Sequence, residues 1–116
     1  MSSFFPGFGA SSTSTGITVL NYTLVDFAMS PYTVIATDNF IDVNTIGGAI
    51  TIFLPDNPAV GRVYIIKDGG FLADINNITI TTVGGAVLID ALATSVINTQ
   101  FQSVELLFNG TEYLLF

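Results

Sequence analysis

The chain has 116 residues, of which 50% are hydrophobic and only 9% are charged. Nine acidic residues outnumber two basic ones and give a net charge of −7, which disfavours binding to nucleic-acid phosphates. Because the sequence contains no His and no Cys, it excludes catalytic triads, disulfides and the common zinc sites. We therefore expect no enzyme and predict no catalytic, cofactor-binding or metal-binding residues.

The shortage of charge points to an assembly of several copies. Ordinary soluble domains are charged at roughly one residue in four, and a single domain with 9% charge would expose large apolar patches, which usually mark interfaces. We predict one domain that forms an obligate oligomer. No apolar run approaches the roughly 20 residues of a membrane span, and the N-terminal residues lack the regions of a secretory signal. We therefore expect no membrane span and folding in a cytoplasm.

Residues 1–16 are rich in Ser, Thr, Gly and Phe and show no sustained hydrophobic period. We predict a flexible N-terminal arm or tether over these residues and a folded domain over residues 17–116. The arm is either a disordered tail or, through Phe4, Phe5 and Phe8, an anchor on another protein, because aromatic residues are enriched at interfaces.

The first part of the folded domain is expected to consist of short strands. Alternating, β-branched and aromatic residues predict strands over residues 17–25, 32–36 and 40–45. Residues 26–31 read as a connection with room for one helical turn. The acidic and amide side chains of residues 38–39 predict the bend before the third strand.

The centre of the chain predicts a long-looped hairpin. Apolar and less apolar side chains alternate over residues 50–54, as they do in a strand. The Pro, Asp, Asn and Gly of residues 55–61 reverse the chain, and residues 63–66 form the second strand. This hairpin carries both basic residues, Arg62 and Lys67.

Two segments resemble each other position by position, IDVNTIGGAITI over residues 41–52 and ITITTVGGAVLI over residues 78–89. Each predicts a strand, a Gly-Gly reversal and a second strand, because glycine readily takes the φ > 0 of tight turns. Two copies are fewer than the three or more units of a solenoid. We interpret them as duplicated hairpins, with chance similarity of β-rich segments as the alternative.

The C-terminal part predicts a loop over residues 69–77, a short strand at residues 96–97 and a final hairpin. Asn109-Gly110 is the strongest short hairpin signal, and a two-residue turn there sets Leu106 opposite Tyr113. The last strand then reaches the C-terminus, which we expect to be packed. The predicted fold class is all-β, with short strands and hairpins forming a compact sandwich or prism.

Taken together, these segments resemble one family. From about residue 32 to the C-terminus the order of parts is similar to that of a C-terminal head domain of phage tail-fibre and giant-virus or virophage fibre-like proteins. The residues that carry the likeness are Ile50–Pro55, Pro58, Gly61–Asp68, Asn77–Ile80, Ile89-Asp90, Ile97-Asn98, Ser103–Phe108, Gly110 and Tyr113. The sequence departs from the pattern at Ala91, where Gly is usual, and at Tyr113, where Trp is common.

The resemblance implies a homotrimeric, non-enzymatic viral structural protein, folded in the host cytoplasm and located in the virion. It would be the head domain of a fibre or virion surface and mediate attachment or virion assembly. Its partners would be two further copies, a fibre stalk or other virion proteins reached through the N-terminal arm, and a host surface glycan or receptor. No collagen repeat precedes the domain, so either the stalk lies outside this sequence or the arm attaches directly. Loops 55–61, 69–77 and 98–102 would present the contact surface.

A few polar residues have more than one interpretation. Asp38, Asp42 and Asn44 offer the hard oxygen ligands that calcium prefers, but their spacing is not that of a calcium loop. Solvated turn and strand-edge acids explain the pattern equally, so calcium near Asp38 and Asp42 is left open. Arg62 and Lys67 are either a ligand clamp or, as we prefer, partners of carboxylates at the trimer seam.

Two other functions stay open at this point. The tyrosines at positions 22, 32, 64 and 113 are expected in the core or an interface, yet they are also suited to stacking on sugars. A glycan-binding module with sites between subunits is therefore the alternative function. A polysaccharide hydrolase would need two carboxylates roughly 5 to 10 Å apart.

Overall fold

The computed structural model describes residues 19–116, so the predicted arm with its three phenylalanines lies outside the described residues. This part of the chain contains short strands and two single 3-10 turns. The elements are β1 (Tyr22–Val25), η1 (Phe27–Met29), β2 (Tyr32–Thr33), β3 (Phe40–Val43), η2 (Thr45–Gly47), β4 (Ile50–Leu54), β5 (Val63–Asp68), β6 (Ile78–Thr82), β7 (Ser95–Ile97), β8 (Ser103–Phe108) and β9 (Tyr113–Leu115). The prediction of an all-β fold is confirmed.

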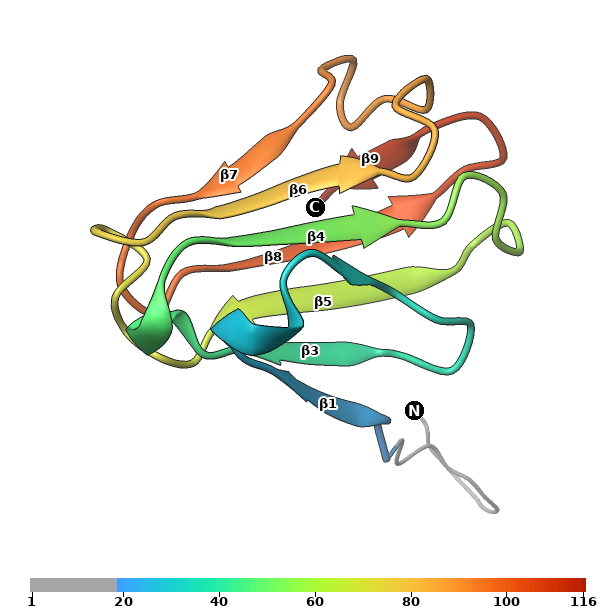
Figure 1. Cartoon of the computed structure of the whole chain (residues 1–116). Coiled ribbons are helices and arrows are strands. Elements are labelled where there is room, and N and C mark those ends of the chain that lie inside the picture. The colour runs from blue at the N-terminus through green and yellow to red at the C-terminus, as the bar shows by residue number, and fades with distance from the viewer. Residues whose placement is uncertain (1–18) are drawn as a thin grey trace.

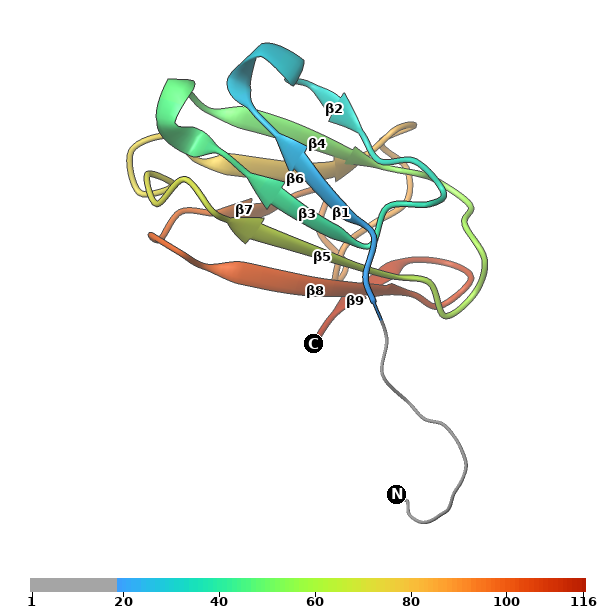
Figure 2. The same cartoon turned by 90° about the horizontal axis from the view of Figure 1, so that it is seen from below.

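The strands form two sheets, one in the order β1-β3-β5-β8-β9 and the other in the order β2-β4-β6-β7 (Figure 1). From β1 to β6 the chain alternates between the sheets, and successive strands within each sheet are parallel. Figure 2 shows the two sheets as layers. This is the connectivity of a β-helix, because each passage through both sheets stacks on the one before. We call the pairs β1–β2, β3–β4 and β5–β6 the three coils.

This topology corrects the prediction of a central hairpin. Strands do occur at residues 50–54 and 63–68, but β4 lies between β2 and β6, whereas β5 lies between β3 and β8. Residues 55–61 therefore carry the chain from one sheet to the other. The alternation of buried and half-buried side chains is the same in both strands, so local sequence does not distinguish a hairpin partner from a coil neighbour.

The duplicated hairpins are also wrong, because β3 and β4 belong to different sheets and β6 pairs only with β4 and β7. Gly47 and Gly48 are needed for a tertiary contact. A Cβ on Gly47 would lie 2.9 Å from the Cβ of Phe27, and one on Gly48 would lie 2.7 Å from its Cε1. The ring of Phe27 in η1 thus lies over η2, and the two turns are neighbours in Figure 2. At the second Gly-Gly, Gly85 does have a positive φ, of 76°.

A repeat does exist, in a different alignment from the predicted one. Ile50-Thr51-Ile52 of β4 lies in register beside Ile78-Thr79-Ile80 of β6. The coils differ in length, because Tyr22 pairs with Phe40 and Phe40 pairs with Ile65, so the second step along the chain is longer than the first. A period that changes from coil to coil cannot be recognised as a fixed repeat.

Antiparallel strands close the last coil. β7 pairs with β6, β8 with β5, and β9 with β8. The predicted C-terminal hairpin is confirmed, but its register is shifted by two residues because Phe108, not Leu106, pairs with Tyr113. The loop has four residues, and the side chain of Asn109 accepts hydrogen bonds from the backbone N–H groups of Thr111 and Glu112, both at 2.9 Å. The packed C-terminus is only partly confirmed, because the side chain of Phe116 is 69% exposed.

The core lies between the sheets and consists mainly of β-branched side chains from alternate strand positions. Its fully buried isoleucines are Ile41, Ile50, Ile52, Ile66, Ile78, Ile80, Ile89 and Ile97. Isoleucines of neighbouring strands lie side by side, so that Ile50, Ile78 and Ile97 form one row across β4, β6 and β7. Each such side chain contributes about 2 kcal/mol through burial. No helix within residues 19–116 is long and apolar enough to cross a membrane.

Candidate interaction surfaces

The three loops predicted to make contacts lie at opposite ends of the molecule (Figure 1). Residues 69–77 follow β5 and residues 98–102 precede β8, and the structure brings these two loops together. The N–H of Asp68, the last residue of β5 before loop 69–77, donates to the carbonyl of Gln102 in the other loop at 2.9 Å. Residues 55–61 connect β4 to β5 at the other end. The predicted contact surface is thus divided between two ends of the sheets.

Two exposed phenylalanines form the centre of the first end. The rings of Phe71 and Phe101 have centroids 6.0 Å apart and are tilted by 49°. Both residues have positive φ, 57° and 61°, a conformation that costs a non-glycine residue roughly 1–2 kcal/mol. The ammonium of Lys67 donates to the carbonyl of Phe101 at 2.6 Å and lies 5.7 Å from its ring centroid. We call Phe71 and Phe101 the aromatic pair.

A buried carboxylate positions both loops of the aromatic pair. Asp68 is fully buried and accepts hydrogen bonds from the hydroxyl of Thr45 at 2.7 Å, the N–H of Ala73 at 3.0 Å and the N–H of Phe101 at 3.2 Å. These donors belong to η2 and to the two contact loops. Because a buried carboxylate must be hydrogen-bonded, this residue holds three separate segments in one arrangement.

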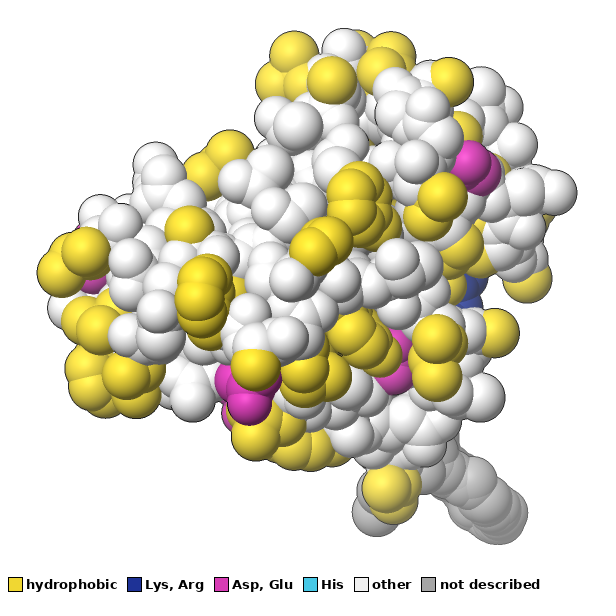
Figure 3. All heavy atoms as spheres, in the orientation of Figure 1, with side chains coloured by type: hydrophobic (Ala, Val, Ile, Leu, Met, Phe, Trp, Pro, Cys, Tyr) yellow, Lys and Arg dark blue, Asp and Glu magenta, His cyan; other side chains and the backbone are white. Residues whose placement is uncertain are grey.

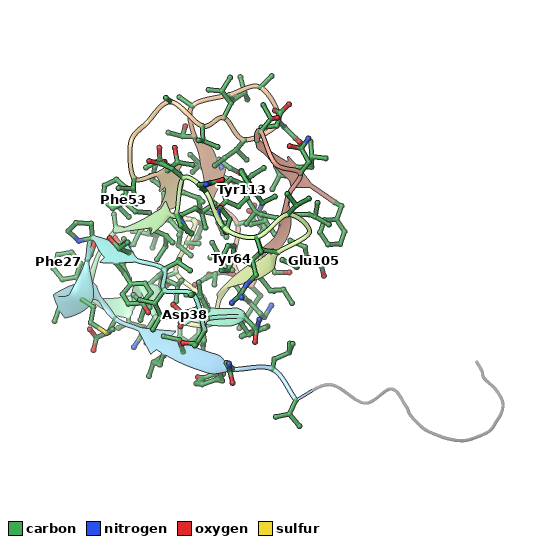
Figure 4. The ribbon with its side chains drawn as sticks, turned by 90° about the vertical axis from the view of Figure 1, so that its right-hand side faces the viewer. Phe27, Asp38, Phe53, Tyr64, Glu105 and Tyr113 are labelled. Carbon is green, nitrogen blue, oxygen red and sulfur yellow. The ribbon has the colours of Figure 1, made fainter. Side chains whose placement is uncertain are left out.

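Asp38 performs the same task at the other end, where Figure 4 shows it among the first strands of the chain. It is 3% exposed and accepts hydrogen bonds from the hydroxyls of Thr23 at 2.6 Å and Tyr32 at 2.7 Å, and from the N–H of Ile35 at 2.9 Å. Thr23 belongs to β1 and Tyr32 to β2. Asp38 therefore ties the two strands of the first coil together across the two sheets.

Arg62 lies beside this network and lines a pocket of about 290 Å³ with Tyr64, Asn57 and Pro58 among its other walls. Its guanidinium donates to the carbonyl of Asp38 and lies 5.1 Å from the ring centroid of Tyr64. Its Nε is buried and has no hydrogen-bond partner among the described residues. Within one chain both cations, Arg62 and Lys67, thus hydrogen-bond to backbone carbonyls. Their predicted pairing across a trimer seam stays a prediction.

The candidate calcium ligands do not converge. The carboxylate of Asp38 is occupied inside the protein by three donors, whereas Asp42 lies on the outer side of β3 and accepts a hydrogen bond from the hydroxyl of Tyr22. Asn44 is used to cap η2, through the N–H of Ile46 at 3.1 Å. Within residues 19–116 no three acidic side chains gather in a way that would hold a metal ion.

The four tyrosines divide between the core and the surface. Tyr64 and Tyr113 are buried, and the hydroxyl of Tyr113 donates to the carbonyl of Pro55 at 2.6 Å. Burial raises the pKa of both. Burial and the hydrogen bond to Asp38 raise the pKa of Tyr32 to about 12. Tyr22 is exposed, and its hydrogen bond to Asp42 raises its pKa.

The outer surfaces of the two sheets have different compositions. Strand alternation places Tyr22, Leu24, Phe40, Val63, Ile65, Leu107, Leu114 and Phe116 on the outside of the five-stranded sheet, with Asp42, Lys67, Ser103 and Glu105 among them. We call this surface the apolar face. The outside of the four-stranded sheet carries Thr33, Thr51, Thr79, Thr81, Phe53 and Val96, and we call it the threonine face. Figure 3 shows this second side, where apolar side chains are scattered among polar ones.

Comparison with models of known protein families gives no match, and no curated protein matches the sequence.

Proposed function

We propose that this chain is a non-enzymatic structural head domain of a virion or viral fibre that works as a homotrimer. The observation that carries the proposal is the amount of apolar surface. Eighteen large hydrophobic side chains are exposed within residues 19–116, against seventeen hydrophobic residues in the buried core. Four of the exposed side chains lie on the apolar face with the half-buried Phe40, Val63, Ile65 and Leu107, and an apolar patch of this kind usually marks an interface.

The mechanism is mechanical. Apolar sheet surfaces from three copies would close a common core, the N-terminal arm would tie the trimer to a stalk or to another virion protein, and the loops would face the host. The resemblance to fibre head domains supports the viral part of the proposal. Loops 69–77 and 98–102 suit a contact role because Asp68 holds both in defined positions, and pre-organised loops lose less entropy on binding.

The test is the mass in solution, measured by light scattering coupled to size exclusion. We expect three times the 12.3 kDa of one chain, and we expect the trimer to persist in mild denaturant as an obligate assembly does. A monomer at every concentration tested would contradict the proposal.

For the viral role, fusion to a trimeric fibre stalk is expected to give a single folded fibre, and an unfolded or aggregated fusion would count against it.

One observation favours glycan binding as a second function. The aromatic pair is exposed, with Phe71 at 45% and Phe101 at 55%, and aromatic rings of this kind offer an apolar face to a ligand. We would screen the trimer on a glycan array and repeat any hit with Phe101→Ala. Phe27→Ala is the matched control, because Phe27 is 51% exposed and lies in η1. Retention of the hit by Phe101→Ala would remove this function from the aromatic pair.

A further inference from the structure

We infer that copies of this chain meet through the apolar face of the five-stranded sheet. The inference rests on the proposed homotrimer and names the surface that closes it. Its occupant is the same face of a second and a third copy. The composition of this face, its complementary charges and its width each support the inference.

The composition of the apolar face is that of an interface core. Eight of its twelve side chains are large and apolar, and they come from every strand of the five-stranded sheet. Tyr22 and Phe40 are stacked, with ring centroids 6.3 Å apart. On the threonine face, four of six side chains are threonines, whose hydroxyls lose hydrogen bonds to water when they are covered. Covering the apolar face therefore releases more free energy than covering the threonine face.

The distribution of charge allows copies to approach on this side. Of the nine acidic residues, Asp38 and Asp68 are buried, Asp42 and Glu105 lie on the apolar face, and Asp26, Asp56, Asp74, Asp90 and Glu112 lie elsewhere. Lys67 is on the apolar face beside Asp42, its register partner. The face thus carries a net charge of −1 from three groups, and Lys67 of one copy is complementary to Asp42 or Glu105 of the next. The threonine face, whose six named side chains are all uncharged, offers no such complementary pair of charges.

The width of the sheet suits closure around a three-fold axis. Five strands about 4.8 Å apart make a surface roughly 20 Å wide. Three such surfaces, arranged as the sides of a triangular prism, lie about 6 Å from the axis, close to half of the roughly 10 Å that separates packed sheets. The side chains of the three faces would then fill the centre without a channel.

The first experiment compares two matched variants by light scattering. Leu114 on β9 and Val96 on β7 both lie on edge strands of three residues, and they are 37% and 40% exposed. Leu114→Glu places a carboxylate in the proposed interface, and we expect association at least about 100-fold weaker, because a buried unpaired charge is costly. Val96→Glu changes the threonine face, and we expect the wild-type mass. Circular dichroism shows whether each variant is folded.

A second experiment needs no disruptive substitution. Because the sequence contains no cysteine, a single introduced thiol reports on one position. Ser103 on the apolar face and Thr33 on the threonine face are both exposed in the single chain. In the assembled protein, under reducing conditions, we expect a maleimide to label Ser103→Cys at least about tenfold more slowly than Thr33→Cys, and we expect equal rates after denaturation.

The outcomes separate the inference from the proposed function. Trimeric wild-type protein with equal labelling rates, or with Leu114→Glu still fully assembled, would overturn the inference and leave the trimer intact. A dimer that Leu114→Glu dissociates would support the face and contradict the trimer. A wild-type monomer at all concentrations would overturn both.

Discussion

Two buried aspartates, one at each end of the sheets, each hold separate segments of the chain together, but they accept hydrogen bonds from different kinds of donor. Asp38 is held mainly by the hydroxyls of Thr23 and Tyr32 and by one backbone N–H. Asp68 is held by one hydroxyl and by two backbone N–H groups. A hydroxyl can turn towards water or towards another acceptor, whereas a backbone N–H is fixed by the path of the chain.

The two carboxylates provide two kinds of order. Asp38 joins β1 to β2, the outermost strands of their sheets, so it stabilises the open end of the coil. Asp68 joins η2 to two loops, so it fixes the aromatic pair. Loss of Asp38 is therefore expected to loosen one coil, and loss of Asp68 is expected to disturb the contact end.

The largest effect is expected from removing the carboxylate with fixed donors. Asp68→Ala leaves the buried Thr45 hydroxyl, the buried N–H of Ala73 and the partly buried N–H of Phe101 without their acceptor, and we expect a loss of about 3 kcal/mol in the free energy of unfolding. Urea denaturation followed by circular dichroism measures it. Asp74→Ala is the control, because Asp74 is an exposed acid in loop 69–77, next to Ala73. We expect this variant to change the free energy of unfolding by no more than about 0.5 kcal/mol. Equal effects of the two variants would refute the role of Asp68.

Removing the other carboxylate is expected to cost less. In Asp38→Ala the hydroxyls of Thr23 and Tyr32 can reorient, so we expect a loss of about 2 kcal/mol. Hydrogen exchange should show faster exchange in β1 and β2 and unchanged exchange in β8. If the protection lost is instead in β8 and β9, the described role of Asp38 as the tie of the first coil is wrong.

The Asp38 network also predicts a response to alkaline pH that the Asp68 network does not share. The pKa of Tyr32 is raised from 10.0 to about 12, so its contribution is fully present below pH 10 and is lost as the pH rises through 12. Tyr32→Phe is expected to cost about 1 kcal/mol at neutral pH, through the lost hydrogen bond to Asp38.

The measurement is the urea midpoint of both proteins between neutral pH and pH 12. We expect the difference between wild type and Tyr32→Phe to shrink above pH 10, because ionised Tyr32 would lie beside the carboxylate of Asp38. The buried Tyr64 and Tyr113, whose pKa values are also raised, remain in both proteins. A difference that is constant with pH would show that the raised pKa of Tyr32 does not contribute to stability.

The smallest effect is expected at the exposed aromatic pair. Phe101→Asn loses ring contacts but relieves the positive φ of 61°, which Asn tolerates better, so we expect a change within about 0.5 kcal/mol. Phe53→Asn is the control, because Phe53 lies in the extended strand β4 and gains no such relief. We expect that variant to lose about 1–2 kcal/mol in thermal or urea unfolding. A similar loss for Phe101→Asn would mean that the aromatic pair serves stability.

Strand positions could be predicted from the sequence because alternation is a local signal. The strands at residues 50–54 and 63–68 show it directly, because buried and half-buried side chains alternate along them. Sheet membership could not be predicted, because the ladder partners Tyr22, Phe40 and Ile65 are distant in the sequence and unevenly spaced. Gly47 and Gly48 have the appearance of a hairpin turn, although the contact that requires small residues is with Phe27.

The sequence predicts where the contact loops lie along the chain, but not which of them meet in space. Gly, Asn and Asp mark residues 69–77, and polar residues mark 98–102, but nothing local indicates that Asp68 bonds to both. The buried Asp38 has the same appearance in sequence as the exposed Asp74. Burial of a single acid depends on which segments converge on it, and that depends on the sheet topology.

The unequal coils have a consequence for how this fold can vary. Strand register stays continuous in the five-stranded sheet although the step from Phe40 to Ile65 is longer than the step from Tyr22 to Phe40. Part of the difference lies in the crossing from β4 to β5, which has eight residues against six between β2 and β3, and each residue added to a crossing costs little because loop-closure entropy grows slowly with length. Peptides inserted near Asn57 or Asp74, both exposed, should be carried without change to the sheets. The domain is thus a scaffold on which surface loops can lengthen and diversify while the core stays the same.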